Sequence, residues 1–415
     1  MRPSEAYWHV GEVVQEIGGV LDQAWKFINA GDGRSALDIL EAITDEYVED
    51  WTDVDDSDGD ASGFFSELGP AWTEALLTAD LTADERAEWA DRLKAWAREI
   101  DDYGVEDAFD HAIRAAEVGW DSPLLRRILA GGGLGPSVDE SAIEPDALIA
   151  ARLNVLDRQG RHDELLRLAR ALGQHERYAT MLARLGRTGE AVAHGLEHLD
   201  QAPAALALAK ALREREELDA ALRIAERGLS LEGSKAELAV WLRDLASVAG
   251  RPELALVAAE VAFREAPSLA AYERARELAG ARWQTLRAAL LDHLRRAQSY
   301  YAEGPVEVFL HEGLIDDAIA VADRSYSYGL IERVAEAAIS ARPDWVIQTS
   351  RKQAEAIMDA GKSNYYPTAA RWLTHARAAY RAAGREPEWK TYLAELLARH
   401  ARKYTLVPRL RELQR

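Results

Sequence analysis

The 415-residue chain contains no cysteine. This absence excludes disulfide bonds, thiolate zinc ligands, iron–sulfur clusters and a cysteine nucleophile, and it fits a reducing compartment. No run of residues approaches 18 consecutive apolar positions, so the sequence predicts no membrane-spanning helix. The first residues also lack the basic and then apolar pattern of a secretory signal peptide. We therefore expect a soluble cytoplasmic protein with no membrane partner.

Alternating runs of Val, Ile and Thr are nearly absent as well, which argues against β-sheet. The composition is dominated by Ala, Leu, Arg and Glu, which are strong helix formers. Apolar residues recur with the helical period, as at Ala36, Leu40, Ile43 and Tyr47, which share one face of a helix. Since 48% of the residues are hydrophobic, the chain can bury a core. The sequence predicts an all-α protein.

A short turn motif recurs along the second half of the chain. Glycine is followed by arginine and, three residues later, by glutamate at Gly160, Gly186 and Gly384, and weaker versions occur elsewhere. Glycine tolerates the left-handed backbone that ends a helix, and an acidic residue favours the start of the next. The turns begin at residues 160, 186, 215, 250, 280, 313, 342 and 384. Their mean spacing of 32 residues is close to the roughly 34-residue tetratricopeptide (TPR) period. We predict an α-solenoid of degenerate TPR-like hairpins.

Charge and tryptophan divide the chain into two parts. Residues 1–145 hold 10 Lys and Arg against 34 Asp and Glu, whereas residues 146–415 hold 40 against 37. Seven of the twelve tryptophans lie in the first 120 residues, and the segment AGGGLGP at 130–136 reads as a linker. We predict an acidic, Trp-rich helical domain at 1–130, a Gly/Pro linker at 131–145 and a TPR-like domain at 146–415.

The acidic stretch between Asp53 and Asp60 is similar in composition to a calcium-binding loop, with Asp56 and Asp58 as weak candidate ligands. An EF-hand requires glutamate at the twelfth position of the loop, and alignment on Gly59 places Phe65 there. The EF-hand match therefore fails. A weak divalent-cation site, a solvated acidic loop and a dock for a basic partner remain open readings.

His194 and His198 belong to an H-x-x-E-H pattern that is typical of one class of zinc peptidase. Their i, i+4 spacing places both imidazoles on one helix face. The pattern lies inside a helical repeat without a catalytic-domain context, so surface histidines on a scaffold helix are the favoured interpretation. A metal-dependent hydrolase that uses His194 and His198 is a remote alternative.

The segment 342–415 is basic, with 15 Lys and Arg against 7 Asp and Glu, and it interleaves arginines with aromatic residues. Cations beside stacking platforms suit single-stranded nucleic acid, which makes a nucleic-acid-associated regulator the alternative function. The same content arises when aromatic residues fill a helical core and arginines face solvent. A basic end could equally meet the acidic N-terminal part of another copy of the chain, or an acidic partner. The candidate partner-binding residues are Arg371, Trp372, Arg377, Tyr380, Arg381, Arg399 and Arg402.

Several long segments resemble the C-terminal helical region of large bacterial SWIM zinc-finger proteins. They are AYWHVGEVV (6–14), AGDGRSALDILEAITDEYVEDW (30–51), DDSDGDASGFFSELGPAWTEALLTADLTADER (55–86), EIDDYGVEDAF (99–109), FLHEGLIDDAI (309–319) and AGKSNYYPTAARWLTHARAAYRAAGREPEW (360–389). The cysteine-containing zinc module of that family is absent, because the chain has no cysteine. The resemblance implies an adaptor region without zinc, whose protein partners include an AAA+ ATPase of a multi-component system.

No complete catalytic motif occurs, and the chain is expected to need no cofactor. Stacked helix pairs leave exposed side chains that are free to bind a peptide or a helix. The sequence therefore predicts a non-enzymatic protein–protein interaction scaffold or adaptor.

Overall fold

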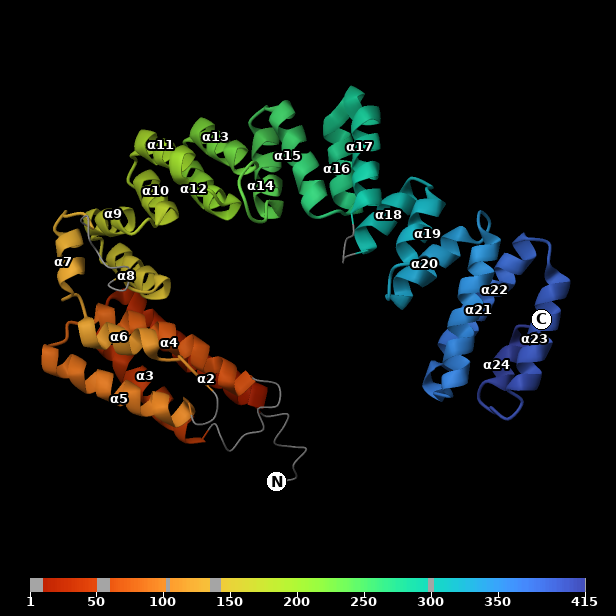
Figure 1. The fold of residues 1–415 in the computed structure, drawn as a ribbon, viewed down its shortest axis with the longest axis horizontal. Coiled ribbons are helices and arrows are strands. Elements are labelled where there is room, and N and C mark those ends of the chain that lie inside the picture. The colour runs from red at the N-terminus through yellow and green to blue at the C-terminus, as the bar shows by residue number, and fades with distance from the viewer. Residues whose placement is uncertain (1–9, 51–59, 102–104, 135–142, 298–301, 415) are drawn as a thin grey trace. The chain divides into compact units, whose positions relative to one another are not determined.

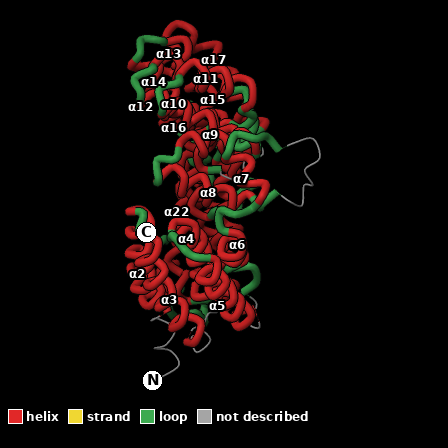
Figure 2. The backbone as a smooth tube through the Cα atoms, turned by 90° about the vertical axis from the view of Figure 1, so that its left-hand side faces the viewer, coloured by secondary structure: helices red, strands yellow, loops and turns green. Residues whose placement is uncertain are grey.

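The computed structural model describes residues 10–50, 60–101, 105–134, 143–297 and 302–414. These residues form helices joined by short loops, and the described part of the chain contains no β-strand (Figure 2). One isolated bridge pairs Gln201 with Glu232. The expectation of an all-α fold is confirmed.

Contacts divide the chain into two compact units. The first comprises residues 1–199 and 210–220, and the second comprises residues 200–209 and 221–415. This division falls at a different place from the predicted domains at 1–130, 131–145 and 146–415. Residues 135–142 of the predicted linker lie outside the described residues, and the domain boundary stays a prediction.

The first unit begins with a bundle of helices (Figure 1). The helices of this bundle are α2 (Val10–Ala30), α3 (Gly33–Asp50), α4 (Asp60–Thr78), α5 (Ala83–Asp101) and α6 (Asp110–Val118). The short helix α7 (Pro123–Leu129) comes after them. Helix α8 (Asp146–Arg158) follows and adds Leu148, Ala151 and Val155 to the same apolar core. The core therefore includes a helix that lies beyond the predicted linker.

The tryptophans of the first unit explain part of its packing. Trp72 is fully buried, and its ring lies 5.2 Å from that of Trp89 and 5.5 Å from that of Trp96. The indole N–H of Trp72 donates to Thr44 Oγ1 at 2.9 Å, and that of Trp120 donates to the Leu77 carbonyl at 2.9 Å. Buried indoles need such acceptors, so these large rings fill the core without a lost hydrogen bond.

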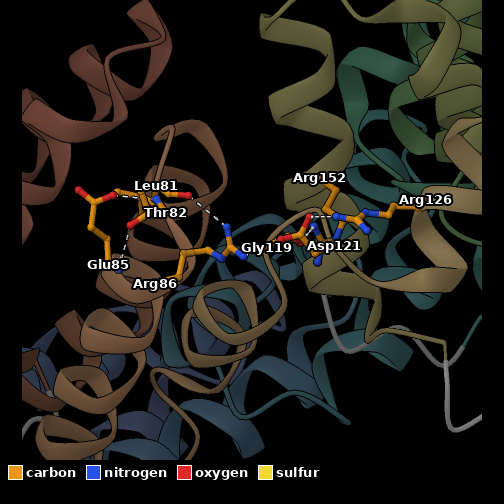
Figure 3. Close-up of polar contacts among 8 residues, drawn as sticks. All are labelled: Leu81, Thr82, Glu85, Arg86, Gly119, Asp121, Arg126 and Arg152. Atoms are coloured by element: carbon orange, nitrogen blue, oxygen red, sulfur yellow. Dashed lines mark hydrogen bonds and ion pairs between the residues drawn. The ribbon is translucent and has the colours of Figure 1, made fainter.

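Helix α5 begins with a capping box at Thr82. The Thr82 amide donates to Glu85 Oε2 at 2.7 Å, and the Glu85 amide donates to Thr82 Oγ1 at 3.3 Å (Figure 3). Arg34 of α3 also donates to Glu85 Oε1 at 2.8 Å. The hydrogen bonds from Arg34 and Thr82 lower the pKa of Glu85 to about 2. One carboxylate thus caps α5 and ties it to α3.

The remaining helices follow one another as hairpins. Those from α9 to α13 are α9 (His162–Ala171), α10 (His175–Arg184), α11 (Thr188–His198), α12 (Ala202–Glu214) and α13 (Leu218–Gly228). Those of the second unit are α14 (Ala236–Val248), α15 (Pro252–Glu265), α16 (Leu269–Ala279), α17 (Trp283–Arg296), α18 (Glu303–His311), α19 (Ile315–Ala322), α20 (Tyr328–Ala338), α21 (Pro343–Ala360), α22 (Tyr366–Ala382), α23 (Glu386–Arg399) and α24 (Val407–Glu412). The eight turns predicted from sequence fall between α8 and α9 and then at every second helix junction up to α22 and α23. The succession of two-helix modules is that of an α-solenoid.

The turn glycines end their helices as the motif predicts. Gly160, Gly186 and Gly384 have φ angles of 67°, 75° and 71°, which lie in the left-handed region. At each turn the amide that follows the glycine bonds back five residues, as Arg161 does to the Leu156 carbonyl at 2.9 Å. This pattern satisfies carbonyls that the helix leaves without a partner.

The arginine and glutamate of the motif pair with each other. The distances from guanidinium to carboxylate are 2.6 Å at Arg161 and Glu164 and 2.7 Å at Arg187 and Glu190. Each arginine is the N-cap residue of the second helix, and each glutamate lies in its first turn. The carboxylate lies near the positive end of the helix dipole, and the arginine holds it there.

At the turn between α12 and α13, glutamate occupies the left-handed position. Glu216 has a φ angle of 65°, and the Glu217 amide donates to the Leu212 carbonyl at 3.0 Å, as in the glycine turns. A non-glycine residue in this conformation costs about 1–2 kcal/mol. The weak turn at residue 215 therefore has the same geometry with a less suitable residue.

We expect Glu216→Gly to raise the free energy of unfolding of the first unit by roughly 0.5–1 kcal/mol, because relief of the left-handed strain exceeds the added chain entropy. Urea denaturation followed by circular dichroism measures the change. Glu216→Ala removes the same charge but keeps the strain, and Gly186→Ala introduces the strain at the equivalent turn. Equal midpoints for Glu216→Gly and Glu216→Ala would contradict the expectation.

A buried arginine joins α8 to the end of α6. The Arg152 side chain is fully buried, and it donates to the Gly119 carbonyl at 2.6 Å and to Glu144 at 2.6 and 2.8 Å. Its guanidinium also lies 5.2 Å from the Trp120 ring centroid. Nearby, Asp121 accepts from Arg86 and Arg126 at the surface (Figure 3).

We expect Arg152→Ala to destabilise the first unit by about 3–5 kcal/mol, because Glu144 and the Gly119 carbonyl lose their buried partner. Arg126→Ala removes an ion pair whose arginine is 66% exposed, so it should change stability by less than about 1 kcal/mol. Thermal denaturation of both variants compares the two sites. A similar loss of stability in both variants would show that burial does not increase the contribution of Arg152.

Candidate functional site

The candidate site lies at the C-terminal end of the second unit. Helices α21 and α22 form a long packed pair, with Gly361 at their junction in the left-handed conformation at φ 72°. Helix α23 packs on α22, and α24 contacts both α22 and α23. The four helices position the basic and aromatic residues that the sequence singled out.

Burial separates the aromatic residues of this segment from its cations. Trp372 is fully buried, and Tyr380, Trp389 and Tyr392 are at most 5% exposed. The Trp389 ring lies 6.0 Å from the Tyr380 ring and 6.1 Å from the Tyr392 ring. These four aromatic residues are core residues, and their faces are not available as stacking platforms.

A polar network fixes Tyr392 beside α21. Its hydroxyl donates to Glu355 Oε1 at 2.8 Å, and the Arg351 guanidinium lies 4.0 Å from its ring centroid. Burial, followed by the hydrogen bond to Glu355, raises the pKa of the Tyr392 hydroxyl above its usual range. Tyr392 therefore remains a neutral hydrogen-bond donor in the core.

The arginines that the sequence named as partner-binding residues differ in their surroundings. Arg371 lies 3.2 Å from Glu332, and Arg399 lies 3.5 Å from Glu355, so both are engaged in surface ion pairs. Arg402 is exposed. Arg377 and Arg381 lie together on α22 at the edge of a pocket. Trp372 and Tyr380 lie beneath this surface, and the partner-binding role of the exposed residues stays a prediction.

The pocket has a volume of about 470 Å³ and is formed by three elements. Arg377 and Arg381 come from α22. Glu386, Trp389, Lys390 and Leu393 come from α23. Leu413 and Gln414, which follow α24, close the remaining side. Its volume falls within the roughly 300–1,000 Å³ of ligand-binding clefts.

The charge of the pocket lining is positive. It contains three cations and one carboxylate, that of Glu386, which lies 3.4 Å from the Arg381 guanidinium. Within the described part of the chain, Arg377 and Lys390 make no ion pair. The pocket is therefore suited to an anionic group.

Sequence reasoning identified Arg377 and Arg381 as candidates but missed the contribution of Glu386, Leu413 and Gln414. A signal for α23 was present, since Glu386, Trp389, Lys390 and Leu393 share one helix face. No sequence signal placed the end of α24 against that face, because this contact depends on tertiary packing.

A second candidate cluster lies between α10 and α11. The structure brings His194 and His198 together with His175, which sequence reasoning missed. His175 Nδ1 and His194 Nε2 share a hydrogen bond of 3.1 Å, and the His175 and His198 rings stack at 4.8 Å. The Tyr178 ring lies 4.6 Å from that of His194.

The surroundings of the His194 ring disfavour its protonated form. Burial lowers its pKa to about 4, and the neighbouring His198, His175 and Arg170 act in the same direction. Among the described residues, no group of three or more His, Asp or Glu side chains is arranged to hold a metal ion. The other candidate metal ligands, Asp56 and Asp58, lie outside the described residues.

Comparisons with known proteins assign no family to this chain. The chain matches no protein-family model and no curated protein. Among solved structures, it is similar to the TPR domain of P58(IPK), with 13% identity and a TM-score of 0.19 over 96% of this chain and 97% of that one. The assignment to the class of helical-repeat proteins depends on the observed hairpins themselves. None of the described helices combines the length and apolar character needed to cross a membrane.

The histidine cluster predicts a pH dependence of stability. Because the folded pKa of His194 lies below its ordinary value of 6.5, the unfolded chain takes up this proton first as the pH falls. His194 therefore does not affect stability above pH 6.5, and it destabilises the first unit progressively between pH 6.5 and about 4. Since His194 is partly exposed, we expect a loss of about 1 kcal/mol by pH 5.

Urea denaturation of the wild type and His194→Gln at pH 7.5 and pH 5.0 measures this effect. The variant should lose less stability on acidification, because its side chain takes up no proton. His111→Gln, on α6, controls for removal of a histidine elsewhere in the same unit. An identical pH dependence for all three proteins would contradict a role for the cluster.

Proposed function

We propose that this chain is a non-enzymatic protein–protein interaction scaffold or adaptor. The observation that carries the proposal is the succession of two-helix modules, in which the predicted turns occupy every second helix junction from α8 to α23. Each module buries its apolar stripe against its neighbours, and the outward side chains remain free to contact another protein.

The chain is further proposed to be related to the C-terminal helical region of bacterial SWIM zinc-finger proteins, without their zinc module. The segments at 309–319 and 360–389 that carry the resemblance lie on α18 to α19 and on α21 to α23. Under this proposal the protein works in the bacterial cytoplasm. Its partners belong to a multi-component system with an AAA+ ATPase.

The proposed contact surface includes the exposed cations of the C-terminal helices. Arg381 and Arg402 are exposed, and Arg377 is half-buried. Four aromatic residues of the same segment are buried, whereas Tyr365 and Tyr404 are exposed. Single-stranded nucleic acid needs aromatic faces beside cations, and the burial of Trp372, Tyr380, Trp389 and Tyr392 removes four of them. This arrangement favours a protein partner over the nucleic-acid alternative.

Hydrogen exchange on the full chain tests the scaffold proposal. Partners would be co-purified from the native cell, expressed separately and recombined with the chain at known stoichiometry. We expect a defined complex in analytical ultracentrifugation, with protection of amides in helices of the hairpin array. The outcome against the proposal is that no recombined protein binds or alters the exchange of any helix.

A further inference from the structure

We propose that the pocket formed by α22, α23 and the residues after α24 is a binding site for an acidic peptide segment that carries an apolar side chain. This inference rests on the scaffold function proposed above and names the chemistry of the partner at one site.

The cations of the pocket are placed by helix periodicity. Arg377 and Arg381 are four residues apart on α22, so they lie on successive turns of one face. On α23, Lys390 shares a face with Glu386 and Leu393, to which it is spaced by four and three residues. Cations from two successive helices therefore border the same pocket.

Two of these cations have no carboxylate partner among the residues that the structure describes. Arg377 is half-buried and Lys390 is exposed, and neither makes an ion pair within the described residues. A guanidinium can bind a carboxylate through two parallel hydrogen bonds, and an ammonium adds a compact positive charge. A partner carboxylate would supply the charge that the pocket lacks.

The floor of the pocket is apolar and well packed. Trp389, Leu393 and Leu413 are 5%, 2% and 8% exposed, so their edges reach the pocket while most of each side chain is held in the core. A floor of this kind favours an apolar side chain next to the anion, because burial of apolar surface adds to the electrostatic attraction.

Glu386 competes with the partner for one cation. Its carboxylate lies 3.4 Å from the Arg381 guanidinium, and both residues line the pocket. Removal of the Glu386 charge would release Arg381 toward a bound anion. A partner must therefore displace Glu386 in order to bind Arg381. A variant that lacks the Glu386 charge should bind the partner more tightly.

A peptide fits these features better than a nucleic acid. The pocket of about 470 Å³ holds a few side chains, whereas nucleic acid requires a stripe of phosphate contacts.

Fluorescence anisotropy on the full chain tests the proposal with a defined probe, a labelled peptide in which glutamates alternate with leucines. We expect binding that weakens as salt is raised. The double variant Arg377→Gln and Lys390→Gln should bind at least about tenfold more weakly. Glu386→Gln should bind about threefold more tightly, since Arg381 becomes available.

Matched controls separate the pocket from general attraction. Lys352→Gln and Lys362→Gln remove the same total charge at exposed positions of α21 and of its junction with α22, and they should leave the affinity within about twofold. A peptide of alternating glutamine and leucine should not bind. A peptide of alternating glutamate and serine should bind more weakly than the leucine peptide. Circular dichroism confirms that each variant is folded.

Three results would overturn the proposal: no binding of the acidic peptide, equal weakening by the control pair, or tighter binding of a single-stranded oligonucleotide that the pocket variant abolishes. The scaffold function is judged separately. If a recombined partner protects the hairpins while the acidic peptide does not bind, the scaffold stands and the pocket assignment fails.

Discussion

The hairpin array depends on how each helix ends. A helix that stops leaves its last carbonyls without partners, and a turn of a few residues must satisfy them before the next helix begins. In this chain a residue in the left-handed conformation allows the following amides to bond back to those carbonyls, as at Gly160, Gly186 and Gly384. The arginine and glutamate that follow then stabilise the start of the next helix. Without this local solution the helices could not fold back and bury their apolar stripes.

Burial separates most aromatic residues of the basic C-terminal segment from its cations. In sequence, cations and aromatic rings alternate and suggest a single binding surface. In the structure, Trp372, Tyr380, Trp389 and Tyr392 fill the spaces between α21, α22 and α23, and the arginines remain outside. Some of those arginines are neutralised by acidic residues of other helices, as Arg371 is by Glu332 and Arg399 by Glu355. Arg377 and Lys390 make no ion pair among the described residues, and both line the pocket.

Arginine has a different role in the first unit. The strongly acidic first 145 residues contain few cations, and several of those described pair with carboxylates that are distant in sequence, as Arg34 does with Glu85. Arg152 lies just beyond this segment and is enclosed between Glu144, the Gly119 carbonyl and the Trp120 ring. Here the guanidinium group joins helices inside the unit. At the C-terminal end of the second unit, the guanidinium groups of Arg377 and Arg381 line a pocket instead.

Local sequence is enough to specify the helical class, the positions of the turns and the capping box at Thr82, because each depends on residues within about one helical turn of one another. Left-handed glycine, helix capping and apolar periodicity are local properties. Tertiary structure alone decided that α8 adds to the core of the first unit, that His175 joins His194 and His198, and that Leu413 and Gln414 close the pocket against α23. These contacts join residues that are distant in sequence, so they depend on which helix faces pack together. The pattern within a single helix shows that a face is apolar, but not which partner covers it.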